Sequence, residues 1–244
     1  MPFLLKAVAS HRYSLLLYLA TADVGFTLIY LVSSLLQKQA LPLFNFEQKW
    51  TIPVVFAAIK LFLIGCFLFT SALWKYCLFQ RSSRYLLLTM GTGFLYLSTD
   101  KLFKFHHLLE FPDWTPSLPR GGGAWILFYL FIQLVMVAVG FRDLVKLWRF
   151  YPQGALMICL GIALFIVGGL GTEIFNHQIS QPLLWQMGQG DRTTFSSLKN
   201  TVEESSELLG ESIALQGLVL FLLKQRHHYF DLQAKKCSYL TFLF

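Results

Sequence analysis

The stretch Ile52-Pro-Val-Val-Phe-Ala-Ala-Ile-Lys60-Leu-Phe-Leu-Ile-Gly-Cys-Phe-Leu-Phe-Thr-Ser-Ala-Leu-Trp74 is almost entirely apolar, and Lys60 is its only charged residue. About 20 consecutive apolar residues are needed to cross the hydrocarbon core of a bilayer as a helix. Lipid offers no hydrogen-bond partner to an open backbone, so a segment this long and this apolar has to be helical there. The stretch therefore predicts a transmembrane helix.

Five other segments have a similar length and apolar character, and none is built on the period-2 alternation of a membrane β-strand. They are Tyr13–Leu36, Tyr85–Phe105, Ala124–Leu147, Gly154–Phe175 and Thr201–Lys224. We therefore expect an all-α fold, a polytopic bundle of about six transmembrane helices in a single domain over residues 1–244. Ala20-Thr21-Ala22 resembles a signal-peptidase site, but apolar residues continue well beyond it, so we interpret the first segment as a retained span.

Composition agrees with a membrane protein. Of the 244 residues, 55% are hydrophobic and only 14% are charged, against roughly 25% charged in a soluble domain. The net charge of +7 comes without a basic stripe interleaved with stacking aromatic residues, so we expect the lipid bilayer and not nucleic acid as the partner. Lys and Arg are most frequent in the loops before the first segment and after the second, fourth and sixth. The positive-inside rule then predicts a multi-pass cell-membrane protein with both termini in the cytoplasm.

Acidic and histidine residues gather where the third, fifth and sixth segments reach the outer side. Charges inside a bilayer cost a few kcal/mol each and are rare unless they have a role. The expected topology brings these residues to one depth, although they are far apart in sequence. They form a candidate metal site of Asp100, His106, His107, Glu173, His177, Glu203, Glu204 and Glu207.

Two kinds of chemistry suit carboxylates and imidazoles that converge from three helices. His106 and Glu110 are four residues apart on one helix face, and Glu173 and His177 repeat that spacing. Such groups ligate metals in helical bundles, so a divalent metal is the candidate cofactor. They can equally hold protons in a relay. The spacing does not distinguish the two, and it assigns no catalytic residue.

Several of these residues also have a structural interpretation. Thr201-x-x-Glu204 matches a capping box, which would explain Glu203 and Glu204 as residues at a helix N-terminus. Lys101 and Lys104 are potential salt-bridge partners of the acids. The Gly-rich run that precedes Glu173 allows close helix packing, so we expect Glu173 to face protein.

Asp23 and Lys60 lie nearer the middle of the membrane, in the first two segments. As antiparallel neighbours they fall within about two helical turns of each other in depth. We expect a structural ion pair that fixes the packing of the two helices, with a role in transport as the alternative.

In this order, the residues resemble a family of uncharacterised bacterial integral membrane proteins. That family has an acid before Ile/Leu-Pro in span 2, Asp-Glu and His-Glu in span 3, a Gly-rich helix ending in Glu, and Glu-Glu-x-x-Glu-x-x-Gly in the last helix. The matching residues here are Glu47 with Ile52-Pro53, Asp100 with His106, Gly168–Glu173 and Glu203–Gly210. Lys101 and His107 stand where the family has Glu, which implies a weakened cation site and a lost or altered activity.

Three functions stay open. The first is a non-catalytic accessory, assembly or sensing subunit of a membrane complex, which suits the short chain, its 24 Phe residues and the replaced acids; it implies a protein partner or an oligomer. The second is a metal-dependent intramembrane hydrolase, in which the metal would activate a water molecule. The third is a proton- or ion-coupled transporter that uses the carboxylates, although no inverted repeat is evident.

Overall fold

The computed structural model describes residues 13–73, 81–105, 124–175 and 188–241, and these residues form an all-α bundle without strands. The predicted fold class is therefore confirmed. Within this part of the chain, six helices follow the order of the predicted segments: α2 (Ser14–Gln37), α3 (Ile52–Leu73), α4 (Arg81–Phe103), α5 (Ala124–Phe150), α6 (Pro152–Ile166) and α9 (Gln189–Thr241). Three short elements connect to them: η1 (Pro42–Phe44), the π-helical η3 (Val167–Gly171) and α7 (Thr172–Phe175).

Four of the described helices are long and apolar enough to cross a membrane. They are α2, α3, the segment Pro152–Gly169 and the segment Asp191–His228 of α9. This confirms a membrane protein by length and composition, with fewer such helices than the six predicted. Helix α4 is not among the four, and it interrupts its apolar residues with Ser, Thr, Gly and Tyr and carries charges near both ends.

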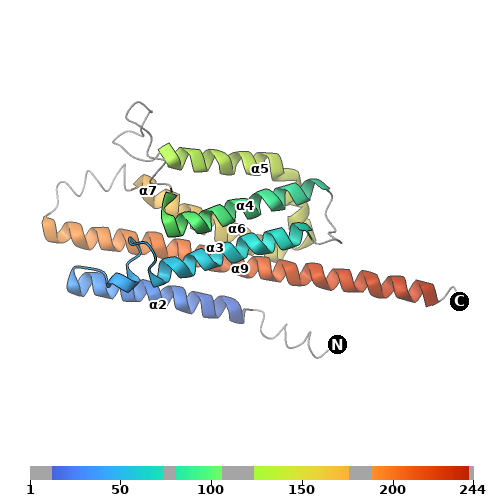
Figure 1. Cartoon of the computed structure of the whole chain (residues 1–244), viewed down its shortest axis with the longest axis horizontal. Coiled ribbons are helices and arrows are strands. Elements are labelled where there is room, and N and C mark those ends of the chain that lie inside the picture. The colour runs from blue at the N-terminus through green and yellow to red at the C-terminus, as the bar shows by residue number, and fades with distance from the viewer. Residues whose placement is uncertain (1–12, 74–80, 106–123, 176–187, 242–244) are drawn as a thin grey trace.

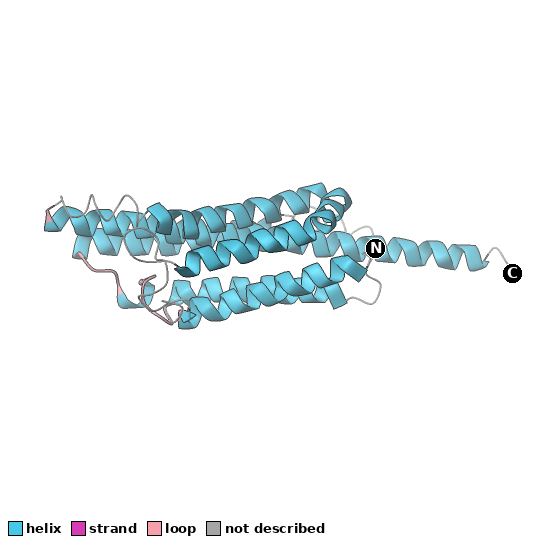
Figure 2. Cartoon of the chain, turned by 90° about the horizontal axis from the view of Figure 1, so that it is seen from above, coloured by secondary structure: helices cyan, strands magenta, loops and turns pink. Residues whose placement is uncertain are grey.

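Consecutive long helices run in alternating directions, so helix ends on the same predicted side lie at the same end of the bundle (Figure 1). Helix α9 is central, in contact with α2, α3, α6 and η3, whereas α5 contacts only its neighbours α4 and α6 among the described elements with substantial contacts. At 53 residues, α9 is about 80 Å long. It runs on past the other helices at its C-terminal end (Figures 1 and 2).

The main apolar core lies between α3, α4 and α9. It contains the buried side chains Ile64, Leu68, Ala72, Leu87, Ala214, Leu215 and Leu218. The outward faces are also apolar: Leu36 of α2 is 79% exposed and Val139 of α5 is 83% exposed. A soluble monomer rarely leaves such extensive apolar surface open to water, whereas lipid covers it at no cost.

Glycines bring two pairs of helices into backbone contact. A Cβ atom at Gly161 of α6 would lie 2.5 Å from the carbonyl oxygen of Gly210 of α9, and one at Gly210 would lie 2.7 Å from that of Gly161. Helices α3 and α4 meet in the same way, since a Cβ at Gly65 would lie 3.1 Å from the oxygen of Gly91. A Cβ at Gly168 would collide with Ser206. The close packing predicted for the Gly-rich run is thus confirmed.

The predicted start of the last helix is wrong. Helix α9 begins at Gln189 and not at Thr201, so Thr201 lies inside the helix and its hydroxyl donates to the carbonyl of Ser197 at 2.6 Å. A side chain bonded back to the preceding turn does not cap an N-terminus. The capping-box explanation of Glu203 and Glu204 therefore fails. The prediction missed this because hydropathy marks where the apolar segment begins and not where the helical backbone begins.

Candidate functional site

Lys101 joins the end of α4 to two acidic residues of α9. Its Nζ lies 2.9 Å from Oε2 of Glu204 and 2.5 Å from Oε2 of Glu207. The two glutamates are three residues apart and so lie on adjacent turns of one helix face. The side chains of Lys101, Glu204 and Glu207 are 19%, 18% and 14% exposed, respectively. We call these three residues the outer cluster.

Further polar contacts surround the outer cluster. Lys104 donates to the backbone oxygen of Glu47 at 2.5 Å, and the Glu47 carboxylate accepts a hydrogen bond from Asn200. Glu203 pairs with Lys199 of the preceding turn of α9 at 3.4 Å. The two contacts of Glu47 tie the connection between α2 and α3 to the end of α4 and to α9. They position the helices around the outer cluster.

The predicted metal site separates into parts with different outcomes. His106, His107 and His177 lie outside the described residues, and of Glu173 only the backbone, within α7, is described. Asp100 is buried in α4. Within the described ranges, no three His, Cys, Asp or Glu side chains are grouped as metal ligands. Two of the predicted carboxylates instead hold a lysine ammonium, so the described residues do not support a metal centre.

The expectation that Lys101 replaces a glutamate of the family that the sequence resembles stays a prediction. The Lys101 ammonium lies between the Glu204 and Glu207 carboxylates, where a bound cation would otherwise balance their charge. Charge-assisted hydrogen bonds of this kind are among the strong ones in proteins. A lysine at this position therefore supplies the positive charge from the chain itself.

A second cluster lies deeper in the bundle. Lys60 Nζ is 2.8 Å from Oδ1 of Asp23, so the predicted contact between α2 and α3 is present. Helix α9 completes it. Lys60 also donates to the carbonyl oxygen of Leu208 at 2.8 Å and to Oγ of Ser212 at 3.2 Å, and Ser212 donates to Oδ2 of Asp23 at 2.5 Å. The Nζ of Lys60 also lies 3.3 Å from Oε2 of Glu211. We call Asp23, Lys60, Glu211 and Ser212 the inner cluster.

The inner cluster is closed to solvent, since each of its four residues is at most 2% exposed. The Lys60 ammonium also lies over the ring of Phe56, 4.9 Å from its centroid, in a cation–π contact. A buried charge is tolerated only when it is paired and hydrogen-bonded. Asp23 and Lys60 satisfy that condition through each other, the Ser212 hydroxyl and the backbone of α9.

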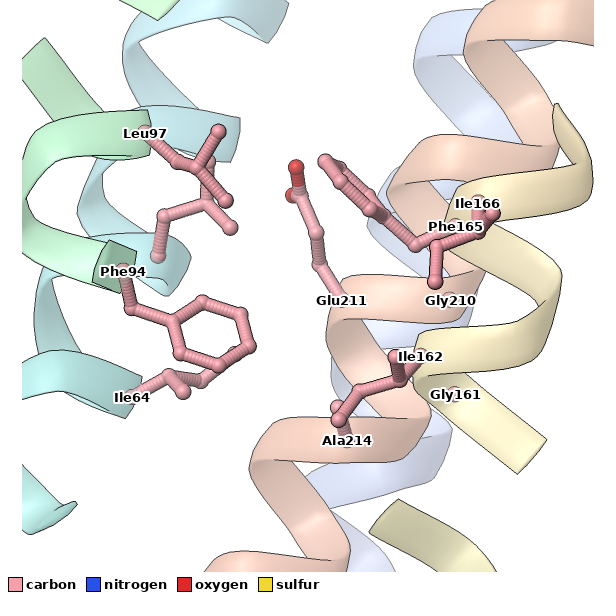
Figure 3. Close-up of a pocket in the computed structure, with 11 residues that line it drawn as sticks. Ile64, Phe94, Leu97, Gly161, Ile162, Phe165, Ile166, Gly210, Glu211 and Ala214 are labelled. Carbon is pink, nitrogen blue, oxygen red and sulfur yellow. The ribbon is translucent and has the colours of Figure 1, made fainter. Parts of the chain in front are cut away.

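Glu211 is the functional candidate that the predicted site left out. Its carboxyl group points into a small pocket between α3 and α4 on one side and α6 and α9 on the other (Figure 3). The pocket has a volume of about 40 Å³, and its remaining walls are apolar: Leu61, Ile64, Phe94, Leu97, Gly161, Ile162, Phe165, Ile166, Gly210 and Ala214. Neither carboxyl oxygen of Glu211 has a hydrogen-bond partner.

A signal for Glu211 was present in the sequence. It continues the stripe of Glu204 and Glu207 by one further turn. What the spacing could not supply was the depth of Lys60 relative to α9. That depth depends on how α3 packs against α9.

Comparison with known proteins identifies one relationship. Residues 14–223 match the family described as Domain of unknown function (DUF8692). No curated protein and no solved structure matches the chain. The match extends from the first residue of α2 to the part of α9 that packs in the bundle, and so includes both clusters.

Proposed function

The chain belongs to the DUF8692 family of unknown function, and we propose from its geometry that it is a non-catalytic accessory subunit of a membrane complex. We further propose that all six helices span the cell membrane, with both termini in the cytoplasm. Three features support this topology: the alternating helix directions (Figure 1), the placement of α4 and α5 beside the four apolar helices, and the distribution of Lys and Arg in the loops.

The length of α9 carries the proposal. Gln225 is the last buried residue among its described side chains, yet the helix continues to Thr241. The segment from Tyr229 to Thr241, which we call the C-terminal arm, adds about 20 Å of helix beyond His228, whose ring still contacts Phe150 of α5. An isolated helix of this length is only marginally stable in water. A partner that packs against the arm would stabilise it, and contact with a partner is how an accessory subunit acts.

The outer cluster supports a non-catalytic role. A catalytic metal site needs carboxylates that are free to bind the ion and an open position for substrate. Glu204 and Glu207 are instead engaged by Lys101. Their contacts join α4 to α9, which is a structural task.

Site-specific photo-crosslinking in cells tests the proposal. A photoreactive residue introduced at Tyr229, Leu232 or Ala234 of the C-terminal arm should give a discrete adduct larger than the chain, with a mass that identifies one protein. The same residue at Val139, on the outward face of α5, is the matched control and should crosslink mainly to lipid. A chain that remains monomeric, with the arm reacting no more than the control position, would contradict an accessory role.

A proton-coupled transporter is the second candidate, because Glu211 is a buried acid without a hydrogen-bond partner. Reconstituted vesicles that carry a pH-sensitive dye measure this directly. Transport predicts a proton flux that is lost in Glu211→Gln and retained in Glu203→Gln, where the substituted residue lies at the periphery. Vesicles that hold their gradient as well as protein-free vesicles would exclude this candidate.

A further inference from the structure

The hydrogen-bond donors of the inner cluster are all directed to groups other than the Glu211 carboxyl group. An ammonium group has three N–H donors. Those of Lys60 are directed to Asp23 Oδ1, the Leu208 carbonyl and Ser212 Oγ. The Ser212 hydroxyl is directed to the other oxygen of Asp23. Asp23 therefore receives a donor on each oxygen, whereas Glu211 receives none.

The charges around Glu211 do not balance if every group is ionised. The inner cluster would then contain two carboxylates, Asp23 from α2 and Glu211 from α9, and one ammonium, Lys60 from α3. The next charged groups that act on Glu211 are Lys101 of α4 and Glu207 of α9 itself. Those two already pair with each other in the outer cluster. The residues of α6 that line the pocket carry no charge.

An ionised carboxylate in this position would be buried without a donor. Although the Lys60 ammonium lies 3.3 Å away, a buried carboxylate that accepts no hydrogen bond is far more costly than the neutral acid. Asp23 has the short contact to Lys60 and both donors, so Asp23 is the ionised member of the pair. We propose that Glu211 is a proton-binding site within the membrane, which holds one proton when the chain is folded.

The position of Lys60 between the two acids links the proton on Glu211 to the contact between Lys60 and Asp23. The Lys60 Nζ is 2.8 Å from Asp23 and 3.3 Å from Glu211, so a small displacement changes which acid it contacts more closely. Loss of the Glu211 proton would place a second negative charge beside Lys60, in competition with Asp23. Proton binding at Glu211 thus controls the contact between α2 and α3. This inference does not depend on an accessory role, because it concerns a group in the bundle and not the C-terminal arm.

A hydrophobic carbodiimide tests the site on the full chain in lipid nanodiscs. Dicyclohexylcarbodiimide adds to protonated carboxylic acids in apolar surroundings, and the modified peptide is located by mass spectrometry. We expect modification at Glu211 at acidic pH and a several-fold decrease at alkaline pH. Glu207, which is hydrogen-bonded to Lys101, is the internal comparison and should be modified much less. Equal modification of the two residues at every pH would overturn the proposal.

Infrared spectroscopy supplies a measurement that does not need reagent access to the pocket. A protonated carboxylic acid has a C=O stretching band that is distinct from those of carboxylates and amides. We expect a buried-acid band in the wild type that is missing in Glu211→Gln and present in Glu203→Gln. Wild-type protein without this band at neutral pH would overturn the proposal, whatever the carbodiimide result. If Glu211→Gln does not fold, assignment can use Glu211→Asp, which should shift the band and not remove it.

Discussion

The inner and outer clusters contain the same charged groups, one lysine and two carboxylates, but differ in burial and in hydrogen bonding. In the outer cluster Lys101 contacts Glu204 and Glu207 at 2.9 and 2.5 Å, and all three side chains are partly exposed. In the inner cluster Lys60 bonds to Asp23, and Glu211 remains at 3.3 Å without a hydrogen bond. Water can compensate an excess negative charge only in the outer cluster. An excess charge in the inner cluster has to be removed by a proton.

Replacing the lysine of each cluster should give the largest difference in stability between the two clusters. Lys60→Met leaves Asp23 as a buried carboxylate without its ammonium, so we expect a loss of about 3–5 kcal/mol of stability. Lys101→Met leaves partly exposed carboxylates that water can solvate, and we expect a loss of about 1 kcal/mol. Unfolding of both variants in mild detergent, followed by circular dichroism against SDS concentration, measures the difference. Equal losses would mean that burial does not distinguish the clusters.

Replacing both Asp23 and Lys60 should restore much of the stability that Lys60→Met loses. In the double variant Asp23→Asn, Lys60→Met, no charge of the pair remains to be compensated, so we expect stability to recover to within about 1–2 kcal/mol of the wild type. The same SDS titration gives the coupling energy between the two positions. A double variant as unstable as Lys60→Met alone would indicate that the Lys60 contacts to Leu208 and Ser212, and not its contact with Asp23, dominate.

Stability should also depend on pH through Glu211. If Glu211 holds a proton in the folded chain and releases it on unfolding, the folded state binds more protons, and stability falls as the pH rises. One proton limits the slope to about 1.4 kcal/mol per pH unit. Glu211→Gln keeps a neutral side chain at every pH and should lose this slope, whereas Glu207→Gln should retain it. The comparison requires SDS titrations at neutral and alkaline pH. Identical slopes in the two variants would assign the proton to another group.

The sequence predicted the fold well because the membrane imposes a simple rule. Apolar length alone located segments such as Ile52–Trp74, and the observed helix Ile52–Leu73 agrees with it almost residue for residue. The contact between Asp23 and Lys60 could be anticipated for the same reason, since rise per residue fixes depth. Where polar residues continue a helix beyond its apolar segment, as from Gln189 to Asn200 in α9, hydropathy carried no signal.

The candidate site was predicted less well, because it depends on which helix faces are in contact. The prediction of Lys101 as a salt-bridge partner of the acids is confirmed, but depth alone did not show that it would join Glu204 and Glu207 in particular. Similarly, Ser212 gave no sign in the sequence that it would donate to Asp23. These contacts depend on how each helix is rotated about its axis, which hydropathy does not report.

The glycine contacts also divide the bundle mechanically. Gly65 with Gly91 joins α3 to α4, and Gly161 with Gly210 joins α6 to α9. At Gly161 and Gly210 the nearest atoms are backbone atoms of the other helix, whereas at Gly65 and Gly91 the side chains of Leu95 and Phe69 also pack against the glycines. Each pair should therefore move as a rigid body, and relative motion should concentrate on the plane between the pairs. The Glu211 pocket lies on this plane, with walls from both pairs (Figure 3). Separation of the two halves would admit water there first.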